Sequence, residues 1–251
     1  MVRTKRRTNP VFDVGELRLV GGEPRAQRAL DDPDSVDLLV WNVFSTLDTH
    51  RDRDWLAYRL EAFGDAPMRP PVRLSLWTGA EREPLLHPAP GYVSHVRERA
   101  RAAGGDDASV AAFATPVEVP VRLESPDVLV LVDATVDTVP VGRGGRERIV
   151  ELVDAGLEHA RRLGKRLAVA TVYQSGSAAA TQLSGRINTL RDPAALAAAL
   201  PHRRTVPPVT LREVSWQQLL RMWSAETGYL DVAGQPVKAF LEHCRARGLL
   251  R

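Results

Sequence analysis

The chain has 251 residues, of which 44% are hydrophobic and 26% are charged, and its formal charge is +3. This composition is typical of a soluble globular protein with one sizeable core, and no apolar run reaches the ~18 residues that span a bilayer. The basic N-terminus lacks the apolar part of a secretory signal, and the single cysteine, Cys244, excludes disulfide frameworks and thiolate-rich zinc sites within one chain. We therefore expect a cytoplasmic protein without a membrane partner.

The N-terminal part of the chain predicts one strand and two helices. Residues 1–30 are expected to be a polar lead-in with a short strand at Glu16–Val20. Asp34 or Ser35 can cap a helix whose apolar residues, from Val36 to Leu47, recur at helical spacing. A second amphipathic helix is expected over Trp55–Phe63, before a stretch rich in glycine and proline.

The middle of the chain predicts most of a sheet. Val72–Trp77 alternates apolar and polar residues, as a half-buried strand does, and a helix is expected near Val93–Ala103. The segment Pro116–Thr138 follows, and it predicts two strands joined by a tight turn at Ser125-Pro126-Asp127. The second of these strands, Val128–Val132, is a continuous apolar run.

The C-terminal half predicts a long helix, a strand and three further helices. The long helix covers Arg146–Leu163 and ends at Gly164, and a buried strand covers Leu167–Tyr173. The remaining helices are expected over 194–200, over 216–223 after Ser215, and over 237–247. Continuous apolar strands indicate layers on both faces of a sheet, so the order of elements predicts an α/β sandwich.

The two strands of Pro116–Thr138 carry acidic residues that suggest a metal site. Glu118 lies in the first strand, and Asp133 follows the apolar run of the second. Two carboxylates on neighbouring strands are the hard oxygen ligands that Mg²⁺ prefers. The same residues have a simpler interpretation as solvated carboxylates at the ends of strands, and the sequence leaves both open.

These motifs resemble the PD-(D/E)XK nuclease superfamily, which has the restriction-endonuclease-like fold. The matching segments are Glu118-Val119-Pro120, the turn at Ser125-Pro126-Asp127, and Asp133-Ala134-Thr135, and the resemblance extends from about residue 35 to residue 225. It implies an α/β/α sandwich with a mixed central sheet and C-terminal helices. We expect a lead-in over 1–30, a core domain over 31–225 and a helical extension over 226–251.

The resemblance also implies a magnesium site at Glu118 and Asp133, but the sequence departs from the family pattern. Pro120 stands where the family has an aspartate ligand, Asp133 replaces the usual glutamate, and Thr135 replaces a lysine that stabilises the transition state. Glu124 could substitute for a lost ligand if Pro120 displaces the strand. Lys165 is expected at the opposite end of the sheet. Mg²⁺ is implied only if the protein is active.

Three arginines after the site are candidates for contact with phosphate. Arg143, Arg146 and Arg148 lie in and just after the segment Gly142–Gly145. This loop lacks the lysine of a P-loop and the pattern of a dinucleotide site, so a phosphate there would belong to a nucleic-acid backbone. A loop without any ligand is the open alternative. Arginine could supply the missing positive charge, but it stays protonated and is a poor general base.

Three functional hypotheses follow from these observations. The preferred one is a nuclease-fold protein with a decayed catalytic site that binds DNA or RNA, or assembles with protein partners. The first alternative is an active Mg²⁺-dependent endonuclease with a rearranged site, and the second is a purely structural subunit. The arginine-rich composition suggests a GC-rich genome, and we expect a bacterial protein. The pI of about 9.3 is compatible with a nucleic-acid partner, but it does not establish one, because 31 acidic residues nearly balance 34 basic residues.

Overall fold

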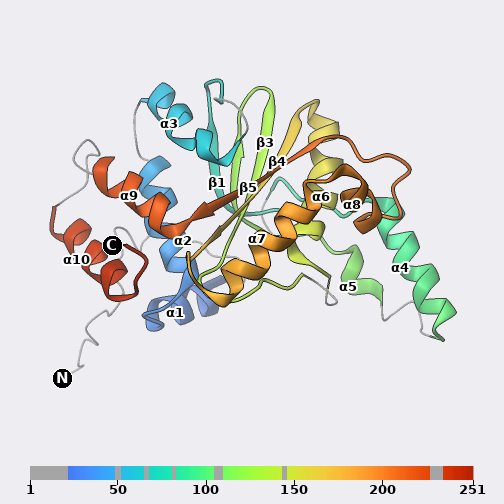
Figure 1. Cartoon of the computed structure of the whole chain (residues 1–251), viewed down its shortest axis with the longest axis horizontal. Helices are drawn as coiled ribbons and strands as arrows, with labels where there is room; N and C mark the ends of the chain where they lie inside the picture. Colours follow the sequence, from blue (N-terminus) through green and yellow to red (C-terminus); the bar gives the residue numbers. More distant parts are fainter. Residues whose placement is uncertain are drawn as a thin grey trace.

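The chain folds around one five-stranded sheet with helices packed against it, as the computed structural model shows (Figure 1). The structure describes residues 22–48, 52–64, 68–80, 83–104, 110–142, 146–226 and 234–250. The strand expected at Glu16–Val20 lies outside these residues. Each helix in the described ranges is too short or too polar to cross a membrane.

The sheet is mixed, which places the protein in the α/β class as expected. Its strands are β1 (Arg73–Thr78), β2 (Val119–Glu124), β3 (Val128–Ala134), β4 (Arg166–Tyr173) and β5 (Val209–Ser215), and they lie side by side in that order. The pairs β1–β2 and β2–β3 are antiparallel, and β3–β4 and β4–β5 are parallel. The first four strands were predicted from their apolar patterns, and β5 was not.

The helices predicted in the first half of the chain are present near their expected positions, and the helices over 22–31 and 111–114 were not predicted. The helices described in this half are α1 (Gly22–Asp31), α2 (Val36–Asp48), α3 (Arg53–Arg59), η1 (Leu60–Phe63), α4 (Pro90–Ala102) and α5 (Ala111–Ala114). The hydroxyl of Ser35 accepts a hydrogen bond from the Leu38 amide at 3.3 Å, which confirms the predicted cap of α2. Helix α1 is a correction, because its residues were expected to be an irregular lead-in.

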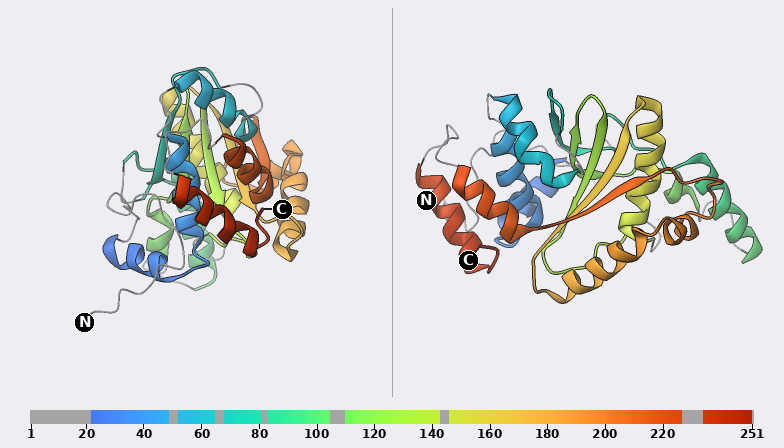
Figure 2. Two further views of the ribbon diagram at one scale, coloured as in Figure 1. Left: turned by 90° about the vertical axis from the view of Figure 1, so that its left-hand side faces the viewer. Right: turned by 45° about the horizontal axis from the view of Figure 1, so that its top comes forward.

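The second half of the chain contains the remaining helices. They are α6 (Arg148–Leu163), α7 (Ala178–Leu190), α8 (Pro193–Ala199), α9 (Trp216–Glu226) and α10 (Gly234–Ala246). Gly164 ends α6 in the left-handed conformation, with φ of 65°, as the sequence predicted. Helix α7 was missed. Figures 1 and 2 show α9 and α10 at one end of the molecule and α4 at the other.

The two faces of the sheet contribute to two separate apolar clusters. On β3, Val130 and Val132 face the first cluster, and Leu129 and Leu131 face the second. Helices α2, α9 and α10 pack in the first cluster, and α6, α7 and α8 pack in the second. The continuous apolar run that predicted a buried strand therefore reflects burial on both faces.

Pro120 interrupts the regular pairing of β2. Val121 pairs with Leu76 and Val119 pairs with Thr78, but the intervening pair of Pro120 with Trp77 is missing from the ladder. Trp77 has a φ of +46°, and the pairing of β2 with β3 ends at Val121. A proline lacks the N–H that a ladder needs, which accounts for the irregularity. The strand lies between β1 and β3 and is not at the edge of the sheet.

Candidate functional site

Asp133 lies at the end of β3, where the sequence predicted it, but it is buried against an arginine. Its side chain is 9% exposed, and its Oδ1 atom lies 3.3 Å from Nε of Arg148 at the start of α6. The apolar run of β3 carries this carboxylate to the sheet's end, and the loop after β3 returns the chain so that α6 begins beside it. The nearest cation to this carboxylate is therefore a side chain of the protein.

Arg148 binds two carboxylates and one main-chain oxygen at once. Besides Asp133, its Nη1 atom lies 2.8 Å from Oε2 of Glu151, one turn further along α6. Its Nη2 atom donates a hydrogen bond to the main-chain carbonyl of Glu118. The planar guanidinium has donors on several sides, which suits it to join three oxygen atoms. These contacts connect the segment before β2, the end of β3 and helix α6. We call Glu118, Asp133, Arg148 and Glu151 the arginine cluster.

The loop before α6 closes the arginine cluster from outside. Gly142 donates its main-chain N–H to the carbonyl of Arg146 at 2.8 Å, and Val141 forms a bridge with Glu147. A side chain at Gly142 would place its Cβ 2.9 Å from Oε2 of Glu151, closer than carbon atoms normally approach such an oxygen. Glycine at this position therefore lets the main chain cover the Glu151 carboxylate, whose side chain is only 2% exposed.

Burial and charge act in opposite directions on Asp133. Burial raises the pKa of this carboxyl, and the adjacent Arg148 guanidinium only partly offsets that effect. Burial also disfavours the charge of Arg148, but Asp133 and Glu151 more than compensate and raise the pKa of its guanidinium. Arg148 therefore remains the fixed positive charge of the cluster, since arginine is protonated throughout the physiological range.

The other sequence-predicted site residues lie nearby with different partners. Glu118 immediately precedes β2 and is half-buried. The Thr135 hydroxyl lies 2.8 Å from the carbonyl of Thr138, and the Thr135 carbonyl accepts a hydrogen bond from the Trp216 indole at 2.7 Å. Thr135 therefore holds the loop after β3 against α9, and its contacts are structural. Pro120 contributes neither a carboxylate nor an N–H.

The residues present do not form the ligand set of a metal ion. Among the described residues, no group of three or more His, Cys, Asp or Glu side chains is arranged to hold one. Magnesium binds to one or two carboxylates that face water or a phosphate. Here the Asp133 and Glu151 carboxylates both face the Arg148 guanidinium, and they are almost fully buried.

The three arginines expected to contact phosphate are placed differently. Arg143 lies outside the described residues. Arg148 is part of the arginine cluster, and Arg146 points to a second buried carboxylate, Asp154, with Nη1 and Oδ2 3.4 Å apart. The side chains of Arg146 and Arg148 are 11% and 16% exposed. Their charges are thus directed mainly into the protein.

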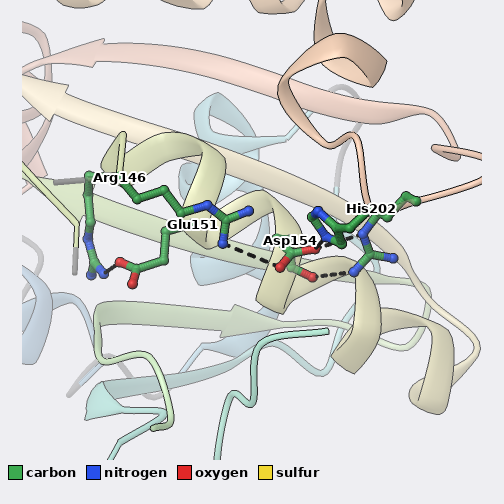
Figure 3. Close-up of polar contacts among 6 residues, drawn as sticks. Arg146, Glu151, Asp154 and His202 are labelled. Carbon is green, nitrogen blue, oxygen red and sulfur yellow. Dashed lines mark hydrogen bonds and ion pairs between the residues drawn. The ribbon is translucent and has the colours of Figure 1, made fainter. Parts of the chain in front are cut away.

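Asp154 is the centre of the most densely connected ionic group in the described structure. Its side chain is fully buried in α6, and Figure 3 shows it between Arg146 and His202. Its Oδ1 atom lies 2.8 Å from Nε2 of His202 and 2.7 Å from Nε of Arg203. Arg203 also donates a hydrogen bond to the Asp154 main-chain carbonyl at 2.7 Å. This aspartate cluster fastens the segment after α8 to the middle of α6.

The electrostatics of Asp154 differ from those of Asp133. Burial alone would raise the pKa of Asp154. The contact with His202 and the charges of Arg146 and Arg203 outweigh burial, so they hold the pKa of this carboxyl below its usual range. Asp154 is therefore ionised in the folded protein, and its three partners neutralise it.

A third ionic group lies at the opposite end of the β2–β3 hairpin. Glu124 contacts Arg122, with Oε2 and Nη2 2.6 Å apart, and it also accepts a hydrogen bond from Lys165. Lys165 lies at this end, as expected, and Glu124 is not available to replace a ligand beside Asp133. His159, near the C-terminal end of α6, is half-buried, and its Nε2 atom lies 3.1 Å from Nη2 of Arg122.

The patterns in the sequence did not single out Glu151, Asp154, His202 or Arg203. Glu151 and Asp154 are spaced three residues apart on α6, a pattern usually found on a solvated helix face. Asp154 contacts His202 and Arg203, which follow 48 and 49 residues later in the chain. The available signal was the presence of Arg146 and Arg148 beside those acids, at spacings of eight and three residues.

Comparison with known proteins finds a weak likeness to a solved structure. Neither the protein-family models nor the curated proteins match the sequence. Among solved structures, the chain is similar to the small subunit of the heterodimeric restriction endonuclease R.BspD6I. The TM-score is 0.28 and the sequence identity is 11%, over 84% of this chain and 87% of that one. These values indicate weak structural similarity.

Proposed function

We propose that the chain has a restriction-endonuclease-like α/β/α core whose metal site has been replaced by an arginine, and that it works as a nucleic-acid-binding subunit without nuclease activity. In this proposal residues 31–225 form the core, 1–30 the lead-in and 226–251 a helical extension. Glu118 and Asp133 are the vestigial catalytic positions, with Pro120 and Thr135 where an aspartate and a lysine would stand.

The contact between Arg148 and Asp133 carries this proposal. A metal-dependent nuclease needs a divalent ion to activate water and to neutralise charge on the phosphate. In this chain Arg148 supplies the positive charge beside Asp133, and its guanidinium is also bound by Glu151 and by the Glu118 carbonyl. A guanidinium carries charge but no water to activate, and it stays protonated. The geometry therefore favours a structural role for the former site.

The loss of two further groups supports an inactive site. Removing a single donor that stabilises transition-state charge costs about 10²–10³ in rate. Thr135 directs its hydroxyl to the Thr138 carbonyl, so it does not replace a lysine, and Pro120 has no side-chain ligand to offer. We expect the combined losses to reduce phosphodiester cleavage below a measurable level.

Exposed arginines support a nucleic-acid partner over a purely structural role. Helix α4 exposes Arg97, Arg99 and Arg101 along thirteen residues, with Glu98 as the acidic residue among them. Guanidinium groups bind phosphate through paired hydrogen bonds. Of the three arginines predicted to contact phosphate, Arg143 remains a candidate, and it lies outside the described residues.

Binding to labelled DNA and RNA, measured over a range of salt concentrations with Mg²⁺ present, tests the proposal. We expect binding that weakens steeply with salt while the nucleic acid stays intact. Replacing Arg143 with glutamine should lower the magnitude of the slope of log K against log salt by about 1. Arg161→Gln is the matched control, because Arg161 lies at the far end of α6 and pairs with Glu158.

Two outcomes of that experiment would contradict the proposal. Cleavage that requires Mg²⁺ and is lost in Asp133→Asn would establish the rearranged endonuclease instead. No binding of either nucleic acid at low salt would favour the purely structural subunit, whose partners are other proteins.

A further inference from the structure

A pocket of about 610 Å³ lies between α4, α5 and the segment that follows α8. The pocket is distinct from the arginine cluster, although one of its lining residues, Arg146, precedes Arg148 by only two positions in the sequence. Its volume is within the range of roughly 300–1,000 Å³ that is usual for small-molecule sites. The side chains relevant to binding are Tyr92, His95, Arg99, Phe113, Arg146 and His202.

Four aromatic rings line the pocket, and each lies near at least one of the others. Tyr92 is 5.3 Å from the His202 ring and 6.5 Å from the Phe113 ring, measured between centroids. His95 lies 6.3 Å from His202. Tyr92 and the His202 side chain are buried and form the wall, whereas His95 and Phe113 are half-buried. The latter two rings therefore offer surfaces on which a planar group can stack.

The charged side chains that line the pocket are positive. Of the described residues that line it, none is acidic, and Arg99 and Arg146 both contribute to the lining. Arg99 is exposed at the rim. Arg146 lies over the Tyr92 ring at 3.6 Å from its centroid, so its guanidinium sits inside the pocket wall. This arrangement suits a ligand that carries both an anionic group and a flat ring.

The aspartate cluster fixes one wall of the pocket in place. Asp154 lies behind the wall and contacts both Arg146 and His202, so these two side chains have partners before any ligand arrives. Figure 3 shows both side chains converging on Asp154. A site whose side chains are already ordered loses less conformational entropy on binding. The fully buried ionic group thus has a clear role as the support of a binding site.

We propose that this pocket binds a nucleoside monophosphate. The base stacks against His95 and Phe113, and the phosphate binds Arg99 at the rim, within the positive field of Arg146. Phosphate and guanidinium form charge-assisted, paired hydrogen bonds. Nucleobases stack on aromatic side chains with little preference for sequence. The proposal does not depend on nucleic-acid binding by the whole protein, because the ligand is a free nucleotide.

Isothermal titration calorimetry of the full chain tests this proposal. The probes are the four common nucleoside 5′-monophosphates, with adenosine and inorganic phosphate as the uncharged and ring-free comparisons. We expect at least one monophosphate to bind about tenfold or more tightly than either comparison, since both the rings and the arginine contribute. Arg99→Gln should weaken binding about tenfold, and Phe113→Leu should weaken it by a smaller factor.

The titration has a control variant, and three results would overturn the proposal. Arg161→Gln changes an exposed arginine on α6 that does not line the pocket, and it should leave the affinity unchanged. The proposal is wrong if no monophosphate binds, or if inorganic phosphate binds as tightly as the best of them. It is also wrong if Arg99→Gln and Arg161→Gln have equal effects. Circular dichroism of each variant establishes that the fold is retained.

Discussion

An Asp154→Ala variant is expected to lose about 3–5 kcal/mol in the free energy of unfolding, which is typical for the removal of one partner from a buried ionic group. The substitution leaves Arg146 and Arg203, two buried or half-buried cations, without the carboxylate that binds both. It also removes the hydrogen bond with His202. Urea unfolding, followed by far-ultraviolet circular dichroism, measures the loss.

The effect of pH on the wild-type protein has a definite sign. The pKa of Asp154 is lower in the folded chain than in the unfolded one. Its contribution to stability is therefore complete above the ordinary pKa of an aspartate and is lost as the pH falls through the lower, folded pKa. In Asp154→Ala that part of the acid dependence should disappear.

Glu158→Gln is the matched control for Asp154. Glu158 lies one turn further along α6, and its partners Arg161 and Arg162 are 72% and 53% exposed. Exposed ion pairs contribute little to stability, so this variant should unfold almost as the wild type does. Equal losses in the two variants would mean that the aspartate cluster does not hold α6 to the segment after α8.

The second large effect is expected for Arg148→Met, which should also lower the free energy of unfolding by about 3–5 kcal/mol. The variant keeps the apolar part of the side chain but leaves the buried Asp133 and Glu151 carboxylates without this cation. Burial would then raise the pKa of Asp133 with less opposition. Because the folded state would bind a proton more readily than the unfolded state, the loss should shrink as the pH falls.

Two further variants test whether the loss of stability expected for Arg148→Met comes from its buried ionic contacts. Arg186→Met removes an exposed pair, since Arg186 and Glu147 have side chains that are 36% and 49% exposed, and it should have only a small effect. Combining Arg148→Met with Asp133→Asn should recover part of the loss, because the unpaired charge is gone. If the double variant is as unstable as the sum of the single variants, the two side chains are not coupled and the arginine cluster is misassigned.

The sequence predicted the parts of the fold that depend on local patterns. The apolar run of Val128–Val132 and the turn before it predicted β3 and its hairpin, and Gly164 predicted the end of α6. Strand β5 was missed because Arg212 and Glu213 interrupt its pattern and because it is an edge strand with one neighbour. Helix α7 was missed because Ala, Gly and Ser give it little amphipathic contrast.

Only some of the site residues could be predicted, because the contacts of the others depend on how distant parts of the chain pack together. The departures at Pro120 and Thr135 are visible in the sequence, and they directed attention to Asp133. The partner of Asp133 depends on how the loop from residue 136 to residue 147 returns, which places Arg148 beside it. Local spacing does not encode that return, nor the contact between Asp154 and residues almost fifty positions later.

We propose that Arg148 takes the position of a metal ion beside Asp133, and titration with Mn²⁺ measures whether a metal ion can still bind there. Calorimetry of the wild-type protein at neutral pH should show no stoichiometric binding of Mn²⁺, because the Asp133 and Glu151 carboxylates are already bound to a cation. Binding of one or two ions per chain, abolished by Asp133→Asn, would mean that Arg148 has not replaced the metal ion.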